Sequence, residues 1–183
     1  QKRFKKEAIK KKKNQRKKRR QRVVLQISFV ISSYRKRLAE KCIQSIENSI
    51  DCPAEFVVIE NKEARKSIFQ VYDEGAEKAK YPILCFLHED VEILSNKYWL
   101  ENVEKLFSKT DTGVVGVAGS KDLTESGIWW DRDNRLSGAA MHVHEGQEYM
   151  TSFGGPYGRV VVVDGVIFLI KKKGILLWRI FRR

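Results

Sequence analysis

Apolar residues along the chain follow two spacings in turn, and this alternation predicts strands separated by helices. Short runs rich in Val, Ile and Phe, bounded by Pro or polar residues, indicate buried strands. Segments with an apolar residue every three or four positions indicate amphipathic helices. The expected strands cover residues 23–33, 55–61, 83–87, 113–119 and 159–170, and the expected helices cover 35–50, 67–79 and 97–109.

This order of elements predicts the α/β class, with an open, mainly parallel sheet that is flanked by helices and connected by right-handed crossovers. In such sheets ligands bind at the carboxyl ends of the strands. Each of the first three expected strands ends in polar residues, which are Ser32 and Ser33, then Glu60 and Asn61, and then His88, Glu89 and Asp90. We therefore expect these side chains to gather on one edge of the sheet, at a binding site.

Residues 119–158 do not continue the pattern. Gly, Trp, His and Asp are frequent there, and the apolar periodicity is poor. We therefore expect a long irregular excursion from one domain that covers residues 23–183. Excursions of this length inside a compact domain are usually functional.

Charge divides the chain into two parts. The net charge is +13, and residues 1–22 contain 14 of the 36 Lys and Arg residues but one acid, Glu7. The remaining residues contain 22 basic and 22 acidic side chains, so the high net charge belongs to a tail that we expect to be disordered. Such a tail binds anionic membrane surfaces or nucleic acid through its charge, or it is simply a solvated extension.

The cysteines and the hydropathy of the chain bear on its location. Cys42, Cys52 and Cys85 show neither paired nor metal-binding spacing, which favours a reducing compartment. The basic N-terminal segment contains no apolar signal core, and the apolar stretch near the other end is too short to span a bilayer. We therefore expect a cytoplasmic protein that is at most peripheral to a membrane.

The triplet His88, Glu89 and Asp90 offers the oxygen donors that hard cations prefer. Mg²⁺ and Mn²⁺ bind carboxylates together with phosphate oxygens. A cation that is shared between a carboxylate and a diphosphate lowers the barrier to breaking the bond to that leaving group. The alternative is structural, with Asp90 capping the segment that follows.

The order of these clusters resembles the GT-A fold glycosyltransferases, and in particular family-2-like bacterial enzymes. The resemblance is carried by ISFVISSYRKRLAEKCIQSI, EFVVIENKE, YDEGAEKAKYPILCFLHEDVEI and VDGVIFLIKK, within residues 23–173. It implies a nucleotide-binding sheet and the transfer of a sugar from a nucleotide sugar, expected to be UDP-linked. The implied acceptor is a hydroxyl group of a saccharide or another molecule, and the implied cofactor is Mn²⁺ or Mg²⁺.

The resemblance also implies a role for each polar cluster. The residues expected to contact the nucleotide sugar are Ser32, Ser33, Tyr34, Glu60, Asn61 and Glu89. The residues expected to hold the cation are Asp90, Glu89 and His88, of which Asp90 is the main ligand. Asp164 and Gly165 would border the acceptor site. His88 stands where these enzymes usually have an acid, so one ligand is lost or replaced.

The catalytic base is not evident from the sequence. The related enzymes place an acidic base after the segment that holds the Asp-Gly pair, but no carboxylate follows Asp164 here. A base must lie within hydrogen-bond reach of the acceptor hydroxyl. We therefore expect a chain that is truncated at its C-terminal end, a base in the excursion, or a protein without activity. Asp164 is the first candidate base, followed by Asp131 and Asp133.

Two further clusters each have two interpretations. His142 and His144 share one side of an extended segment and form a candidate metal clamp with Glu145 or Glu148, although histidines at such positions are more often at the surface or hydrogen-bonded. The Trp pair at residues 129–130 either stacks on sugar rings or packs under a long loop.

Two other functions remain open on the sequence alone. A nucleotidyltransferase uses a similar sheet edge and a cation but attacks phosphorus. A protein without catalytic activity could instead bind polyanions through its basic tail, and the missing distal acid favours this alternative.

Overall fold

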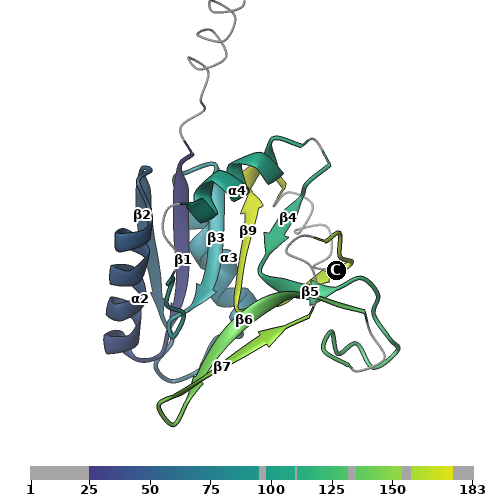
Figure 1. The fold of residues 1–183 in the computed structure, drawn as a ribbon. Helices are drawn as coiled ribbons and strands as arrows, with labels where there is room; N and C mark the ends of the chain where they lie inside the picture. The colour runs from purple at the N-terminus through teal and green to yellow at the C-terminus, as the bar shows by residue number, and fades with distance from the viewer. Residues whose placement is uncertain (1–24, 95–97, 110, 132–134, 154–157, 175–183) are drawn as a thin grey trace, which may run out of the picture.

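The computed structural model describes residues 25–94, 98–109, 111–131, 135–153 and 158–174. In chain order the elements are β1 (Ile27–Ser33), α2 (Lys36–Ser49), β2 (Ala54–Glu60), α3 (Ile68–Lys78), β3 (Ile83–His88), α4 (Tyr98–Phe107), β4 (Val114–Gly116), β5 (Ala118–Ser120), β6 (Leu136–His144), β7 (Gln147–Ser152), β8 (Val162–Val163), β9 (Ile167–Lys171) and a 3-10 turn (Lys172–Gly174). The elements form two sheets, and the α/β class expected from the sequence is confirmed (Figure 1). The basic tail expected at 1–22 lies outside the described residues.

The first sheet has the strand order β2-β1-β3-β9-β4. β1 is parallel to β2 and β3, whereas β9 is antiparallel to both β3 and β4. The sheet is therefore mixed, because β1, β2, β3 and β4 run in one direction and β9 runs in the other. The physical reason is the path of the chain, because β9 follows the second sheet, which lies beyond the carboxyl ends of β1 and β3 (Figure 1). The chain thus enters β9 at that edge and runs back.

The segment expected as one strand at 113–119 forms two strands in different sheets. β4 pairs with β9 in the first sheet, and β5 pairs with β6 and β8 in the second. Val117 lies between the two strands and marks the point where the chain passes from one sheet to the other.

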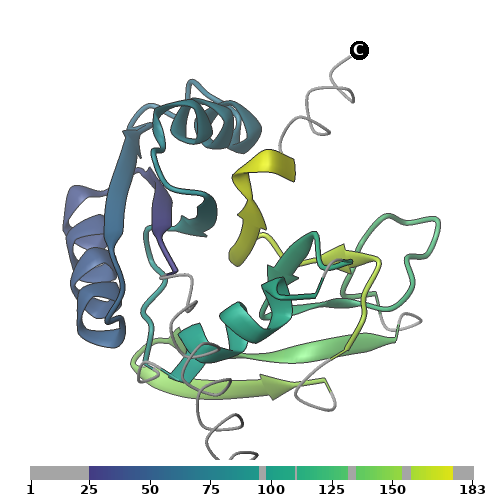
Figure 2. The ribbon, with the colours of Figure 1, turned by 90° about the horizontal axis from the view of Figure 1, so that it is seen from above.

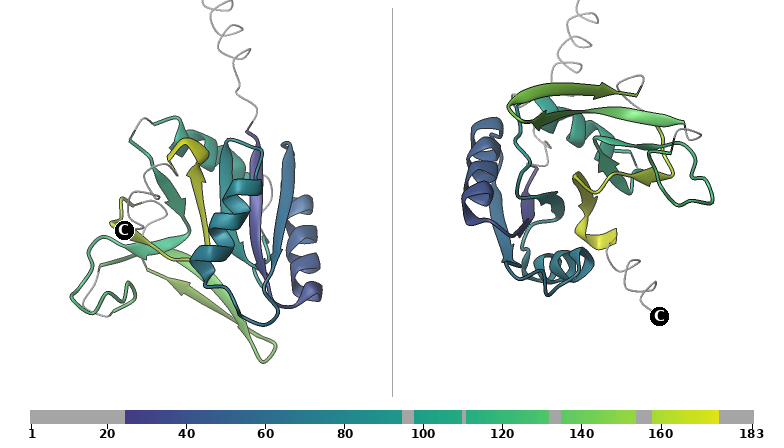
Figure 3. Two further views of the ribbon diagram at one scale, coloured as in Figure 1. Left: turned by 180° about the vertical axis from the view of Figure 1, so that it is seen from behind. Right: turned by 90° about the horizontal axis from the view of Figure 1, so that it is seen from below.

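The irregular excursion expected at 119–158 contains regular structure, because β6 and β7 pair in an antiparallel hairpin from Ala139–Ser152 to His144–Gln147. The hairpin extends below the first sheet in Figure 1 and in the left view of Figure 3. Every residue from Met141 to Met150 is exposed. A ribbon with both faces in solvent has no buried side, and so its sequence shows no apolar alternation.

Two apolar layers cover the first sheet, one on each face. On one face Phe29 and its neighbours pack against α2 and α4. On the other face Val30 and Phe86 pack against α3, which lies on the opposite side of the sheet from α4 (Figure 2). These layers hold the strands and thereby fix the positions of their ends. No described helix is long and apolar enough to cross a membrane.

Helix α3 confirms the helix expected at 67–79 and explains the glycine inside it. Ser67 caps the helix by accepting a hydrogen bond from the Gln70 amide, and the Gln70 side chain accepts one from the Ser67 amide in return. A Cβ atom at Gly75 would lie 2.1 Å from Val30 Cγ1. The glycine therefore permits the close approach of α3 to β1, at the cost of some helix propensity.

A buried polar network closes the amino end of β1. Ser28 Oγ donates to Glu55 Oε1 at 2.5 Å and accepts a hydrogen bond from the Tyr81 amide at 3.0 Å. The Lys80 amide also donates to Glu55. Partial burial acts to raise the pKa of Glu55, but the hydrogen bonds from Ser28 and from the backbone outweigh it, and the pKa lies below its ordinary value.

This network predicts a pH dependence of stability. Because the folded pKa of Glu55 is lowered, its contribution is present above the unfolded pKa of about 4.3 and is lost as the pH falls through the folded pKa. Urea unfolding at pH 7 and at about pH 3 should therefore show a larger loss of stability in the wild type than in Glu55→Gln. Equal losses in the two proteins would contradict this role of Glu55.

Candidate functional site

The carboxyl ends of β1, β2 and β3 lie level at one edge of the first sheet. In the parallel register Ser32 is the neighbour of His88, and Ser33 is the neighbour of Glu60. The Asn61 amide donates to the Ser33 carbonyl at 2.7 Å, which ties the two strand ends together. The structure therefore brings the three polar strand ends expected from the sequence to a common edge, which Figure 3 shows from below.

The turn before β9 reaches the same edge. The His88 amide donates to the Val166 carbonyl at 3.3 Å, and the Asp164 amide donates to the Ala118 carbonyl at 2.8 Å. Asp164 Oδ1 accepts a hydrogen bond from the Val166 amide at 2.7 Å, so one oxygen of this carboxylate shapes the turn. Asp164 and Gly165 thus border the edge where β3 ends, and we call this region the strand-end mouth.

The three residues of the His88–Asp90 triplet do not point the same way. The Val91 amide donates to the His88 carbonyl at 3.4 Å, so Glu89 and Asp90 are the central residues of a turn. The side chains of His88 and Asp90 are exposed, whereas Glu89 is 6% exposed. The turn therefore presents Asp90 to solvent and directs Glu89 into the protein.

Glu89 binds the segment that joins β1 to α2. Its Oε2 accepts hydrogen bonds from the Tyr34 and Arg35 amides at 2.7 Å each and from Ser33 Oγ at 3.2 Å. Its Oε1 lies 3.4 Å from Arg35 Nε. The position of this carboxylate thus differs from the expectation that Glu89 faces a cation or a nucleotide sugar.

The carboxylate also suits the start of α2. This helix begins after Arg35 and has neither a side-chain cap nor an acidic residue in its first turn. A negative charge beside the amino end of a helix is stabilising, because it faces the positive end of the helix dipole. Glu89 supplies that charge from another element, and so it joins the exit of β3 to the exit of β1.

Two further contacts fix the rest of the segment along α2. Cys42 Sγ lies 3.8 Å from the His88 carbonyl oxygen, to which it donates. Ser45 Oγ accepts a hydrogen bond from the Ile93 amide at 3.0 Å. Asp90 therefore lies between two points at which its segment is attached to the helix.

Two cysteine thiols are buried in this part of the protein, and their surroundings change their pKa values. Burial raises the pKa of the Cys42 thiol to about 12, with further contributions from Asp90, Glu92 and Glu89. Burial likewise raises the pKa of the Cys85 thiol. Both thiols therefore remain protonated near neutral pH, and neither is a nucleophile there.

We expect the three cysteines to differ in reactivity. Cys52 is partly exposed, whereas Cys42 and Cys85 are fully buried. Brief treatment with iodoacetamide at about pH 8, followed by mass spectrometry of peptides, should show Cys52 labelled first and the other two protected. Denatured protein is the control, because all three should then react. Early labelling of Cys42 would contradict the packing of α2 on the triplet.

The described residues contain no group of three His, Cys, Asp or Glu side chains that could enclose a metal ion. Asp90 is the exposed carboxylate of the triplet, and one carboxylate does not make a closed metal site. Mg²⁺ is commonly bound by one or two carboxylates together with substrate phosphates and water. Asp90 could therefore hold a cation only together with phosphate oxygens of a ligand.

The other residues that were expected to contact a nucleotide sugar lie at the rim of the mouth. Glu60 is exposed at the end of β2, and Lys62 Nζ lies 3.4 Å from Glu60 Oε2. Tyr34 is 58% exposed. The Asn61 side chain bonds to the backbone of Lys66, so it shapes the loop that follows β2.

The alternative base Asp131 is not brought to the mouth. Asp131 accepts hydrogen bonds from Thr124 Oγ1 at 3.3 Å and from Ser126 Oγ at 3.0 Å, within the loop between β5 and β6. This loop projects away from β1 and β2 in Figures 1 and 2. Asp133 lies outside the described residues.

The candidate metal clamp on the hairpin is not formed with either Glu145 or Glu148, both of which are among the described residues. His142 and His144 share a face of β6, as expected, and are opposite Tyr149 and Gln147. Glu148 is opposite Val143 and therefore lies on the other face. The strand alternation thus separates the histidines from this carboxylate.

The two tryptophans, which were expected either to stack on sugar rings or to pack under a loop, differ in their surroundings. Trp129 packs edge to face against Trp130 and Phe153, with ring centroids at 5.8 and 6.1 Å. Trp130 is 63% exposed. Trp129 therefore packs under the loop, and Trp130 alone offers a free aromatic face.

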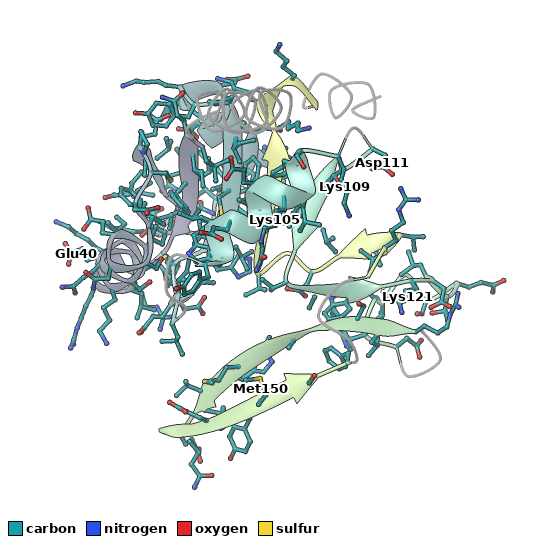
Figure 4. The ribbon with its side chains drawn as sticks, turned by 45° about the horizontal axis from the view of Figure 1, so that its top comes forward. Glu40, Lys105, Lys109, Asp111, Lys121 and Met150 are labelled. Carbon is teal, nitrogen blue, oxygen red and sulfur yellow. The ribbon has the colours of Figure 1, made fainter. Side chains whose placement is uncertain are left out.

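A cavity of about 960 Å³ lies elsewhere, along β4 and the segment 158–163. Figure 4 shows Lys109 and Asp111 beside the start of β4, and both line this cavity. Among the described residues, none of the site residues expected from the sequence lines this cavity.

Comparison with known proteins adds one match. Residues 28–179 match the family model described as a glycosyltransferase-like family. No curated protein matches the chain.

Proposed function

The chain belongs to the glycosyltransferase-like family, and on that premise we propose that it transfers a sugar from a nucleotide sugar, UDP-linked, to a hydroxyl group of a saccharide or another acceptor. The observation that carries the proposal is the strand-end mouth, where three polar strand ends and the Asp164 turn meet. Ligands of open α/β sheets bind at the carboxyl ends of the strands. The matched residues include every part of this mouth.

The nucleotide would bind along the ends of β1 and β2. Tyr34 and Glu60 are exposed there and offer an aromatic face and a carboxylate to the base and ribose. Ser32 and Asn61 lie beside them on the same edge. A carboxylate suits ribose hydroxyl groups, because an ionised carboxylate accepts hydrogen bonds from them.

The diphosphate would lie at the end of β3, where Asp90 holds the cation and His88 lies beside it. When bound, Mn²⁺ or Mg²⁺ neutralises the charge that develops on the departing diphosphate. The exposure of the Asp90 side chain leaves its carboxylate free to face a ligand.

Asp164 is the proposed base of the acceptor side. It borders the mouth next to the end of β3, and one of its oxygens already holds the turn before β9. Its carboxylate would accept the proton of the acceptor hydroxyl as the oxygen attacks the anomeric carbon and the bond to the diphosphate breaks. The protein supplies position and charge, and the nucleotide sugar supplies the leaving group.

Calorimetry with UDP-, GDP- and ADP-linked sugars, each with and without Mn²⁺, tests the proposal. We expect UDP-sugars to bind and Mn²⁺ to strengthen their binding. An assay with a hydroxyl acceptor should then release UDP. Release of pyrophosphate would indicate nucleotidyl transfer instead, and a chain that binds none of these nucleotides would overturn the proposal.

A further inference from the structure

We propose that Glu89 is a positioning residue, which holds Asp90 at the strand-end mouth by joining the exit of β3 to the exit of β1. The inference rests on the proposed function, since Asp90 is the proposed cation ligand. It assigns to Glu89 a role different from that of a ligand, although both residues belong to the same short acidic triplet.

The surroundings of Glu89 are those of a structural anion. Its side chain is 8% exposed, and a buried carboxylate is tolerated only where donors compensate for the lost hydration. Three donors on one oxygen provide this compensation, namely the Tyr34 amide, the Arg35 amide and Ser33 Oγ. A cation bound at this oxygen would have to displace these donors, and two partly buried amides would lose their protein partner.

The contacts of Glu89 act on Asp90 through the backbone. Asp90 follows Glu89 directly, in a segment that is attached to α2 on one side of Asp90 through the His88 carbonyl and on the other side through the Ile93 amide. With Glu89 anchored at the start of the same helix, the backbone on either side of Asp90 has little freedom. A ligand that is held in place before the substrate arrives loses less entropy on binding.

The same contacts also connect the two sides of the mouth, which are the end of β1, where the nucleotide is proposed to bind, and the end of β3, where Asp90 lies. Glu89 binds the amides of Tyr34 and Arg35, which lie beside the proposed nucleotide pocket, and it precedes the proposed cation ligand. One carboxylate therefore sets the separation between the nucleotide side and the cation side. A diphosphate would have to span both sides, so this separation would decide whether Asp90 could hold a cation on the phosphates.

Glutamine is the informative substitution at this position. All three short hydrogen bonds are made to Oε2, and a glutamine oxygen can accept from both amides. The amide nitrogen would then face Arg35, whose side chain is 64% exposed and free to turn into solvent. Glu89→Gln should therefore preserve the position of Asp90, whereas Glu89→Ala should not.

The test measures how strongly Mn²⁺ enhances UDP affinity, as the ratio of dissociation constants without and with the cation. Loss of an outer partner of a metal ligand typically weakens metal binding by about 10- to 100-fold, and we expect this loss of enhancement in Glu89→Ala. Glu89→Gln should keep the enhancement within about threefold, which corresponds to well under 1 kcal/mol. Asp90→Asn should abolish it. Glu92→Gln removes an exposed carboxylate from the same segment and is the matched control.

Hydrogen exchange provides a readout that does not depend on ligands. The Tyr34 and Arg35 amides should exchange slowly in the wild type and in Glu89→Gln, and faster in Glu89→Ala. If Glu89→Ala does not fold, Ser45→Ala releases the Ile93 end of the same segment and should lower the Mn²⁺ enhancement severalfold by the same reasoning. If the variant that folds, whether Glu89→Ala or Ser45→Ala, keeps the full Mn²⁺ enhancement of UDP affinity, the proposal is overturned.

Two other results would also overturn it. If Glu89→Gln loses the Mn²⁺ enhancement as completely as Asp90→Asn does, Glu89 is itself a ligand. If Glu89→Ala is folded and keeps the full enhancement, its contacts serve the fold alone. Both results leave the wild-type affinity for UDP and Mn²⁺ intact, whereas a wild type without nucleotide affinity would remove the proposed function and this role with it.

Discussion

Asp90→Asn is expected to lower the rate of sugar transfer by about 100-fold or more, because a cation on the leaving group contributes several kcal/mol and each 1.36 kcal/mol is a factor of ten. Asparagine keeps the size of the side chain and one oxygen but removes the charge that attracts the cation. Since Asp90 is exposed at the mouth, its replacement should leave the fold intact. The measurement is the initial rate of UDP release with a hydroxyl acceptor, over a series of Mn²⁺ concentrations.

Glu92→Gln is the control for this change. Glu92 is an exposed carboxylate two residues further along, so it contributes similar charge to the region without lying in the turn. Its replacement should alter the rate by no more than about twofold, as expected for a surface substitution. Equal losses in the two variants would show that general negative charge, rather than Asp90 as a ligand, supports the reaction. An unchanged rate in Asp90→Asn would exclude a ligand role.

The polar edge at the carboxyl ends of β1 and β3 was predictable from the sequence, because these strands are marked by long apolar runs. β1 and β3 are buried on both faces and read as continuous apolar runs, and the polar residues that end them mark the point where the chain leaves the core. In the parallel register of the structure, Ser32 lies beside His88. The mouth is therefore encoded locally, in the ends of three strands.

The direction of β9 and the course of the hairpin were not predictable in this way. β9 (Ile167–Lys171) contains a run of four apolar residues, which fits either direction in a sheet, and its direction depends on where the preceding chain lies. The exposed hairpin lacks the buried face that gives strands their alternating pattern. Both features depend on contacts between distant segments.

The inward direction of Glu89 had a signal that sequence reasoning missed. Successive side chains at a strand exit point to opposite sides, so the middle residue of the triplet should face away from His88 and Asp90. Its partners, however, are backbone amides at Tyr34 and Arg35, and amides are present in any sequence. The alternation of side chains therefore predicts that one of the two acids faces the protein interior. Only the structure shows that this acid, Glu89, binds the amides of Tyr34 and Arg35.

Gly138→Ala is expected to lower the free energy of unfolding by about 3–5 kcal/mol, which is among the larger effects of single substitutions. Gly138 lies where β6 changes its partner from β5 to β7, and its φ is +110°. A Cβ atom there would lie 2.1 Å from the Val117 carbonyl oxygen and 2.6 Å from Ala118 Cα. Because these are backbone atoms of a neighbouring strand, the clash can be relieved only by moving the strands apart.

Gly146→Ala separates this clash from the strain of a positive φ. Gly146 lies in the turn of the same hairpin with φ +78°, and a Cβ atom there would meet no atom within 4 Å. Its replacement should therefore cost only the left-handed strain of about 1–2 kcal/mol. Urea unfolding of both variants measures the difference, which is the contribution of the contact with Val117. Equal losses would mean that β6 does not pass so close to Val117, and the second sheet would then not be fixed to the first at this crossing.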